Sequence, residues 1–256
     1  MAIPTQPRVG LFVTCLVDMF RPTIGFAAVA LLTEAGCQVE VPEAQTCCGQ
    51  PAYNTGDRTT TRRVAKAVIA AFEGYDYVVG PSGSCMAMIA KDYPTLFEDE
   101  PEWAARARAL AEKSYEITAF LVDVMRFTPT DMKFEGRATY HDSCAGLRGV
   151  GVHDQPRALL SMVEGLELVE MKDPNVCCGF GGTFCVKMPE ISNKMVADKT
   201  ADIAATGADT LLAGDLGCLM NMAGKLTREG RPVKARHVIE VLAGMADRPA
   251  IGESDS

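Results

Sequence analysis

Short apolar segments alternate along the chain with longer segments that have one apolar face. The short segments have the length of buried strands, and the longer ones repeat their apolar residues with the period of a helix. The predicted strands are residues 9–14, 39–41, 75–79, 138–140, 166–171 and 210–213. The predicted helices are residues 24–35, 58–74, 102–125, 156–164, 189–206 and 238–245. Because strands that alternate with helices form parallel sheets covered on both faces, we expect an α/β fold.

The order of these elements occurs twice. The first half runs strand, helix, strand, helix, strand, and the second half repeats that order after a polar connection at residues 127–136. We therefore predict two similar lobes in tandem, one over residues 1–130 and one over residues 131–256. Each lobe is expected to contain a parallel sheet flanked by helices.

The ten cysteines follow the same repeat. Each half has a Cys after its first predicted strand, a Cys-Cys-Gly after its second and a Cys after its third, and equivalent members are 129, 130, 130 and 133 residues apart. These are Cys15, Cys47, Cys48 and Cys85 in the first half, and Cys144, Cys177, Cys178 and Cys218 in the second. Ligands in open α/β sheets bind in loops at the carboxyl ends of strands. The four thiols of a lobe are therefore predicted to meet at one point.

Composition and net charge argue against several classes of protein. The chain has 256 residues, 48% hydrophobic and 23% charged, as in an ordinary globular protein. A net charge of −8 argues against a nucleic-acid binder and against a polybasic membrane surface. We expect no targeting signal at residues 1–7 and no membrane span, since the apolar segment 24–32 is too short. A cytoplasmic protein is thus expected, in which thiols serve as metal ligands or catalytic groups more often than as disulfides.

The spacing of the cysteines also bears on the metal. Thiolates favour zinc, copper(I) or iron–sulfur clusters. The pattern differs from the paired cysteines of zinc ribbons and from the cysteine run of ferredoxins. Adjacent side chains such as Cys47 and Cys48 diverge in an extended chain, so they suit two irons of one cluster better than a single ion. Gly49 and Gly179 then let the backbone pass close to a bulky inorganic core.

The motif Cys-x31-Cys-Cys-Gly-x35-Cys, present in both halves with small changes in spacing, resembles the cysteine-rich CCG-domain family. That family includes a cysteine-rich component of heterodisulfide reductase and the iron–sulfur component of glycolate oxidase. The segments Cys-Cys-Gly-Gln-Pro-Ala at 47–52, Gly-Pro-Ser-Gly-Ser-Cys at 80–85 and Cys-Cys-Gly-Phe-Gly-Gly-Thr-Phe at 177–184 are most similar to its lactate-utilization members. The resemblance extends from Val9 to about Met245.

This resemblance implies a cofactor and partners. The eight repeated cysteines would be the iron ligands of a 4Fe-4S cluster, with one or two clusters per chain. The chain would be an electron-transfer subunit of a cytoplasmic complex that oxidises L-lactate to pyruvate. It would work with a ferredoxin-type iron–sulfur subunit and a third subunit, and would be a redox subunit rather than a complete enzyme.

Two positions depart from the heterodisulfide reductase pattern. Those modules end in Cys-x2-Cys, but the first of the two positions is Ser82 in one half and Asp215 in the other. Each lobe therefore keeps four repeated thiols, enough for an ordinary four-iron cluster. If only one lobe holds a cluster, the glycine-rich segment 179–182 favours the second.

Three other functions stay open from the residues themselves. The chain could be a complete oxidoreductase that acts on a thiol, a disulfide or a 2-hydroxy acid such as glycolate at an open iron site. It could be a structural α/β protein stabilised by zinc. It could also be a redox sensor that forms labile disulfides between the adjacent cysteines at 47–48 and 177–178.

Four further residues have a structural and a functional interpretation. Cys37 and Cys185 lack a counterpart in the other half, so each is expected to pack as a small apolar residue, with a ligand or redox role as the alternative. His141 precedes Cys144 and is either a donor, proton carrier or ligand of the site, or a histidine satisfied by a backbone carbonyl at a strand end. His237 is typical of a helix cap.

Overall fold

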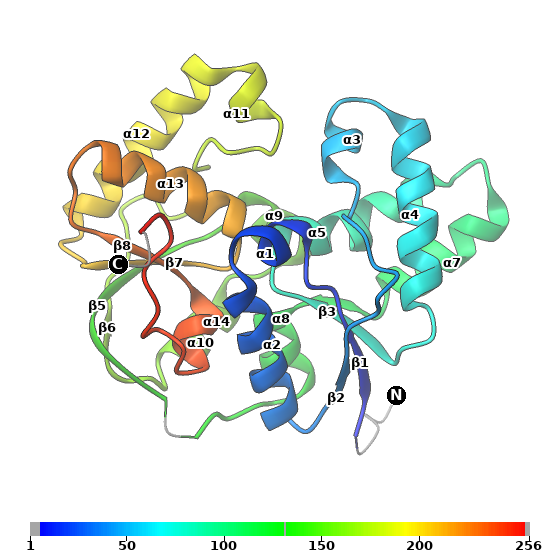
Figure 1. Ribbon diagram of the computed structural model, residues 1–256, viewed down its shortest axis with the longest axis horizontal. Coiled ribbons are helices and arrows are strands. Elements are labelled where there is room, and N and C mark those ends of the chain that lie inside the picture. Colours follow the sequence, from blue (N-terminus) through cyan, green and yellow to red (C-terminus); the bar gives the residue numbers. More distant parts are fainter. Residues whose placement is uncertain (1–5, 131, 254–256) are drawn as a thin grey trace.

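Strands and helices alternate through both halves of the chain, as predicted (Figure 1). The structure, a computed structural model, describes residues 6–130 and 132–253, so the expectation about a targeting signal at the N-terminus lies in part outside the described residues. The elements of the first half are β1 (Arg8–Leu11), α1 (Cys15–Phe20), α2 (Pro22–Glu34), β2 (Gln38–Glu40), α3 (Gln50–Asn54), α4 (Arg58–Phe72), β3 (Tyr77–Gly80), α5 (Gly83–Ala87), the π-helical segment η1 (Met88–Asp92), α6 (Tyr93–Leu96), α7 (Pro101–Ala111), β4 (Ser114–Glu116), α8 (Ile117–Ala119) and the π-helical segment η2 (Phe120–Val124). The elements of the second half are β5 (Lys133–His141), α9 (Cys144–Val150), α10 (Asp154–Leu160), β6 (Glu164–Leu168), α11 (Phe184–Lys187), α12 (Pro189–Ala205), β7 (Thr210–Ala213), α13 (Leu216–Arg228), β8 (Lys234–His237) and α14 (Val238–Leu242).

Among the described residues, eight strands form two parallel sheets of four, with the orders β2-β1-β3-β4 and β6-β5-β7-β8. The two orders are the same when the second half is aligned on the first. In each sheet the chain turns to opposite sides of its first strand, so a switch point lies between β1 and β3 and another between β5 and β7. Ligands in open α/β sheets bind at such points. The α/β fold with two tandem lobes is confirmed, whereas the boundary at residues 130 and 131 stays a prediction.

The helix predicted over residues 102–125 is wrong in its middle. Helix α7 ends at Ala111, and the strand β4 follows, pairing Ser114 with Val78 of β3. Helix propensity is a weak signal that tertiary pairing overrides. The open edge of β3 supplies backbone partners that a continued helix would leave unpaired, and this decides the conformation of the segment.

Strand β8 and helix α13 were also missing from the prediction. The sequence of β8 is Lys-Ala-Arg-His, which contains one apolar residue and so lacks the apolar run that predicts a buried strand. Helix α13 was predicted only as a loop that carries Cys218. Its first turn contains small residues, Gly217 and Cys218, which obscure the helical pattern.

Where local signals are strong, the predicted helix ends agree with the structure. The Asp57 side chain accepts a hydrogen bond from the Thr60 amide at 2.9 Å and so caps α4. Pro22 stands at the first position of α2. His237 caps α14, with Glu240 completing a capping box.

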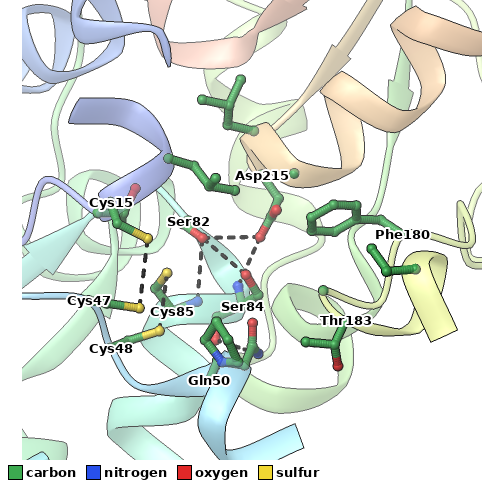
Figure 2. Close-up of a pocket in the computed structure, with 17 residues that line it drawn as sticks. Cys15, Cys47, Cys48, Gln50, Ser82, Ser84, Cys85, Phe180, Thr183 and Asp215 are labelled. Atoms are coloured by element: carbon green, nitrogen blue, oxygen red, sulfur yellow. Dashed lines mark hydrogen bonds between the residues drawn. The ribbon is translucent and has the colours of Figure 1, made fainter. Parts of the chain in front are cut away.

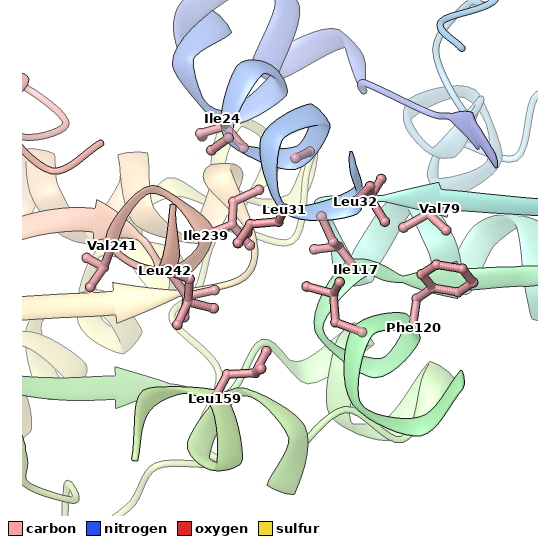
Figure 3. Close-up of a cluster of buried hydrophobic side chains, with 14 of the residues drawn as sticks. Ile24, Leu31, Leu32, Val79, Ile117, Phe120, Leu159, Ile239, Val241 and Leu242 are labelled. Carbon is pink, nitrogen blue, oxygen red and sulfur yellow. The ribbon is translucent and has the colours of Figure 1, made fainter. Parts of the chain in front are cut away.

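The main hydrophobic core lies between the two lobes rather than inside either one. Figure 3 shows side chains from α2, α8, η2, α10 and α14 meeting in the space between the sheets. Helices α2 and α14 pack together, as do α8 and α10, so each contact joins the two lobes. Two further cores lie under the outer helices, one beneath α4 and α7 and one beneath α12 and α13. The shared core holds the lobes in one arrangement.

Helices that follow equivalent strands also make equivalent contacts between the lobes. Helix α5 of the first lobe packs on α9 of the second, and α1 of the first packs on α13 of the second. Helix α5 corresponds to α13, and α1 to α9, so these contacts are related by an approximate two-fold exchange. Both pairs begin next to the cysteines. Within the described residues, none of the helices has the length and apolarity of a membrane span.

Candidate metal centre

The four repeated cysteines of the first lobe meet at one point (Figure 2). Cys15 begins α1 directly after β1, Cys47 and Cys48 lie in the loop after β2, and Cys85 lies in the first turn of α5 after β3. The sulfurs of Cys15 and Cys47 are 3.7 Å apart, and those of Cys48 and Cys85 are 3.6 Å apart. The switch point between β1 and β3 thus brings together thiols that are up to 70 positions apart in sequence.

The second lobe repeats this arrangement. Cys144 begins α9 after β5, Cys177 and Cys178 follow β6, and Cys218 lies in the first turn of α13 after β7. The sulfurs of Cys178 and Cys218 lie within 4.8 Å of each other, and Cys144 and Cys177 are close enough for each to shift the pKa of the other. In both lobes the backbone N–H of the next glycine donates to the first sulfur of the adjacent pair: Gly49 to Cys47 and Gly179 to Cys177, each at 3.4 Å.

Within each group of four cysteines, one thiol has a lowered pKa and others have a raised pKa. The pKa of Cys47 is lowered because its sulfur accepts hydrogen bonds from Cys15 and Cys48. Hydrogen bonding to Cys47, followed by burial, raises the pKa of Cys15 and of Cys48. In the second lobe the same effects lower the pKa of Cys177 and raise that of Cys144 and Cys178. Each lobe therefore favours one thiolate surrounded by thiols. A metal cation that binds to the group would displace the remaining thiol protons.

The backbone conformation after each cysteine pair requires a glycine, a requirement that the sequence pattern does not reveal. Gly49 and Gly179 have φ angles of +86° and +82°, which side chains rarely adopt. A Cβ on Gly179 would also lie 2.8 Å from the carbonyl oxygen of Ser192 in α12. Thus these glycines turn the loop sharply and let it rest on the helix behind it, α4 in one lobe and α12 in the other.

A cavity of about 290 Å³ lies in front of the first-lobe cysteines. Figure 2 shows the sulfurs on one side and Phe180 and Thr183 of the second lobe on the other. Among the described residues, its lining is mainly apolar and includes no Lys, Arg or His. Among the described residues of this lining, Asp215 is the one with a charged side chain.

Ser82 and Asp215, which replace the additional cysteines of the heterodisulfide reductase pattern, bond to each other across the lobes. The Ser82 hydroxyl donates to Asp215 Oδ2 at 3.1 Å, and the Ser84 backbone N–H donates to the same oxygen at 3.1 Å. Ser82 also caps α5 by accepting a hydrogen bond from the Cys85 amide. The two positions therefore connect the lobes beside the cysteines.

His141 is fully buried at the end of β5. Neither ring nitrogen has a hydrogen-bond partner within the part of the chain that the structure describes, so the interpretation as a histidine satisfied by a backbone carbonyl is wrong. A ring nitrogen of His141 and the sulfurs of Cys178 and Cys218 all lie within 4.8 Å of one another. Burial, followed by the charge of Lys199, lowers the pKa of His141 to about 3, so its imidazole is neutral.

The remaining cysteines lie apart from the two groups. Cys37 is buried in the core between the lobes, as predicted. Cys185 is half-buried and its thiol donates to the carbonyl oxygen of Gly182 at 3.2 Å. All ten cysteines are free thiols.

One charged residue of the second site was missed by sequence analysis. Lys199 of α12 is buried, and its ammonium donates to the carbonyl oxygens of Asp173 at 2.6 Å and Pro174 at 3.3 Å. It fastens the loop that leads to Cys177. No local pattern marks a lysine for burial, since its position on a helix face looks the same as that of a solvent-exposed one.

Comparison with known proteins agrees with this geometry. The model of the cysteine-rich CCG domain matches twice, at residues 9–90 and 138–223, once in each lobe. Lactate utilization protein A from Geobacillus kaustophilus is 51% identical over 235 residues, which cover 92% of this chain and 98% of that protein. Lactate utilization protein A from Bacillus licheniformis is 48% identical over 235 residues, with coverage of 92% and 98%.

Among solved structures, a hypothetical protein from Helicobacter pylori superposes with a TM-score of 0.62 at 9% sequence identity. The match covers 99% of this chain and 52% of that one, so this chain spans about half the length of that protein. At this identity the likeness shows the fold alone. The two domain matches and the close relatives together show that the chain belongs to the cysteine-rich CCG-domain family, within the group of lactate utilization protein A.

Proposed function

We propose that this chain binds iron–sulfur clusters and passes electrons within a multi-protein system for lactate utilization. The observation that carries the proposal is the convergence of four thiols at the strand switch point of the first lobe. The four equivalent thiols of the second lobe follow the equivalent strands, and the sulfurs of Cys178 and Cys218 lie within 4.8 Å of each other. The names of its relatives supply the pathway. Cytoplasmic location and partnership with a ferredoxin-type subunit and a third subunit belong to the same proposal.

The donor set fits a 4Fe-4S cluster. Each lobe brings four sulfur ligands together, and such clusters are held by four cysteine thiolates. The ligands would be Cys15, Cys47, Cys48 and Cys85 in the first lobe, and Cys144, Cys177, Cys178 and Cys218 in the second. When bound, the cluster supplies one-electron transfer. The protein contributes the position of the thiols, the amide N–H groups of Gly49 and Gly179, and the apolar surroundings.

The cavity beside the first-lobe cysteines supports electron transfer over direct oxidation of a hydroxy acid. Lactate and glycolate are carboxylates, and binding sites for carboxylates use cationic side chains or clusters of donors. The described lining of this cavity has no cationic side chain. The Asp215 carboxylate would repel an anion, and it already accepts the hydrogen bonds of the Ser82 hydroxyl and the Ser84 backbone N–H. We therefore place lactate oxidation on a partner subunit.

The first test is iron, acid-labile sulfide and zinc per chain on protein purified without oxygen. Two loaded lobes would give about eight of each of iron and sulfide, and one loaded lobe about four. Cys48→Ser and Cys178→Ser each remove a ligand from one lobe, so each is expected to lower iron by the content of that lobe. Cys37→Ser is the matched control, because Cys37 lies in the core away from both groups.

Zinc without sulfide would contradict the proposal and favour the structural zinc protein. The link to lactate is tested by growth on lactate of cells that depend on this chain. Cys178→Ser is expected to abolish that growth and Cys37→Ser to preserve it. Full growth of the Cys178→Ser strain with a full iron content would also contradict the proposal.

A further inference from the structure

The two cysteine groups have different surroundings, although their thiols are arranged alike. His141 of the second lobe is offset by 129 residues from Phe12, the same offset that relates Cys144 to Cys15. Both side chains are fully buried. The position three residues before the first cysteine therefore carries an imidazole in the second lobe and an apolar ring in the first.

A second difference lies on the helix behind each group. Val64 of α4 packs against Gly49, and Met195 of α12 packs against Gly179, which aligns the helices with an offset of 131. With this offset the buried Lys199 corresponds to the buried Val68. The second lobe thus replaces two apolar side chains of the first with a donor and a cation.

The unpartnered ring of His141 points to a ligand that accepts a hydrogen bond. A polar side chain buried without a partner is destabilising, so native proteins rarely leave one without a function. Here the ring nitrogen lies within 4.8 Å of the sulfurs of Cys178 and Cys218. An imidazole ring has at least one N–H donor in either protonation state. The sulfurs of a bound cluster would be the acceptors that the ring lacks.

We propose that His141 donates its ring N–H to the sulfurs of a cluster bound in the second lobe and thereby raises the reduction potential of that cluster above the potential of the first-lobe cluster. Hydrogen bonds to cluster sulfurs stabilise the reduced, more negative state. This inference rests on the proposed cluster binding. It assigns His141 as a positioning residue, because the four thiols already supply the ligands of a four-iron cluster.

Charged side chains near the second group of cysteines also influence the potential of a cluster there, but their contribution is separate from that of His141. The Lys199 ammonium acts in the same direction as His141, and the Asp215 carboxylate, which raises the pKa of Cys144, acts in the opposite direction. Both remain in place when His141 alone is changed. A comparison of His141 variants therefore isolates the contribution of the imidazole.

The test is a potentiometric titration followed by electron paramagnetic resonance. A Cys48→Ser background leaves the second-lobe cluster to be measured alone. His141→Phe reproduces the first-lobe residue and is expected to retain iron while the equilibrium constant for reduction falls about tenfold, which is about 59 mV for one electron. His141→Gln keeps an N–H donor and is expected to stay closer to the parent. In a Cys178→Ser background, Phe12→His is expected to raise the potential of the first-lobe cluster.

Hyperfine spectroscopy with isotope-labelled histidine provides a second readout, because the size of the nitrogen coupling in the parent protein distinguishes a hydrogen bond from direct ligation. A weak nitrogen coupling that disappears in His141→Gln would support a hydrogen bond. A strong coupling would show a direct iron–nitrogen bond and overturn the proposal, as would equal potentials in His141→Phe and its parent. An iron content that Cys178→Ser does not lower would instead contradict cluster binding in the second lobe, which separates failure of the proposed function from failure of this inference.

Discussion

Glu116 carries a carboxyl group into the contact between the two lobes. Its Oε2 accepts hydrogen bonds from the backbone N–H groups of Thr118 at 2.8 Å and Ala119 at 3.3 Å, so it caps α8. Its Oε1 has no hydrogen-bond partner among residues 6–130 and 132–253. Burial raises the pKa of Glu116 to about 7, and the nearby Asp215 carboxylate adds to the effect.

The raised pKa of Glu116 predicts that stability falls as pH rises through a defined range. The folded protein holds this proton up to about pH 7, whereas the unfolded chain releases it near pH 4.5. Between these values the folded state binds more protons, so a higher pH favours unfolding. Glu116→Gln is expected to be as stable as the parent near pH 4.5 and more stable above pH 7, by roughly 2–3 kcal/mol.

Denaturant unfolding of the apoprotein at a series of pH values measures this difference. A Glu116→Gln variant whose advantage is constant across the series would show that the carboxyl does not titrate in this range.

At the scale of single residues, the eight repeated cysteines were identifiable from sequence because they recur with nearly constant offsets. Glu116 and Lys199 were not, since only the packing of the two lobes and of α12 determines that they are buried.

At the scale of single elements, the loops after β2 and β6 depend on glycines in the left-handed region. Gly179 has both a φ of +82° and no space for a side chain, since a Cβ would lie 3.0 Å from the Cβ of Met195. Gly36, at the end of α2, has a φ of +89° and nothing within 4 Å of the position of a Cβ. A comparison of alanine substitutions at Gly179 and Gly36 therefore separates backbone strain, which is present at both positions, from crowding, which is present only at Gly179.

Gly179→Ala is expected to destabilise the protein by roughly 3 kcal/mol and Gly36→Ala by about 1 kcal/mol, because only the first adds overpacking to the strain. Gly179→Ala should also lower the iron content, because the backbone shift that relieves the clash moves the Gly179 N–H away from the Cys177 sulfur to which it donates. Unfolding midpoints and iron analysis on the same preparations measure both effects. Equal losses of stability, or an iron content unchanged in Gly179→Ala, would contradict this role of the loop.

Prediction of elements succeeded where the signal is local and failed where pairing decides. The Asp57 cap and Pro22 mark the starts of α4 and α2 through contacts within one turn. Strand β4, by contrast, forms because β3 offers an open edge 36 residues earlier, at the pairing of Val78 with Ser114. A local pattern contains no information about such a partner.

At the scale of the whole molecule, Glu240 connects α14 of the second lobe to α2 of the first. Its Oε1 accepts hydrogen bonds from Arg21 Nε at 2.8 Å and from the Thr23 hydroxyl at 2.6 Å, and its side chain is fully buried. Its Oε2 accepts a hydrogen bond from the His237 backbone N–H. Removal of one partner from a buried ion pair leaves an uncompensated charge.

Glu240→Ala is therefore expected to destabilise the protein by roughly 3–5 kcal/mol. Asp198→Ala is the control: its ion pair with Lys194 has side chains that are 61% and 75% exposed, so the expected loss is under about 0.5 kcal/mol. Denaturant unfolding measures both. A Glu240→Ala variant as stable as Asp198→Ala would show that this pair does not hold the lobes together.

The α/β class, the repeat and the eight cysteines follow from the amino-acid sequence, because each depends on apolar periodicity or on spacing along the chain. The way in which the two halves meet depends on tertiary contacts. These contacts place α2, α8, α10 and α14 in a shared core, join Ser82 to Asp215, and leave His141 buried beside the second group of thiols without a partner among the described residues. These features arise from contacts between segments that are far apart along the chain or from burial, and neither has a signature in local sequence.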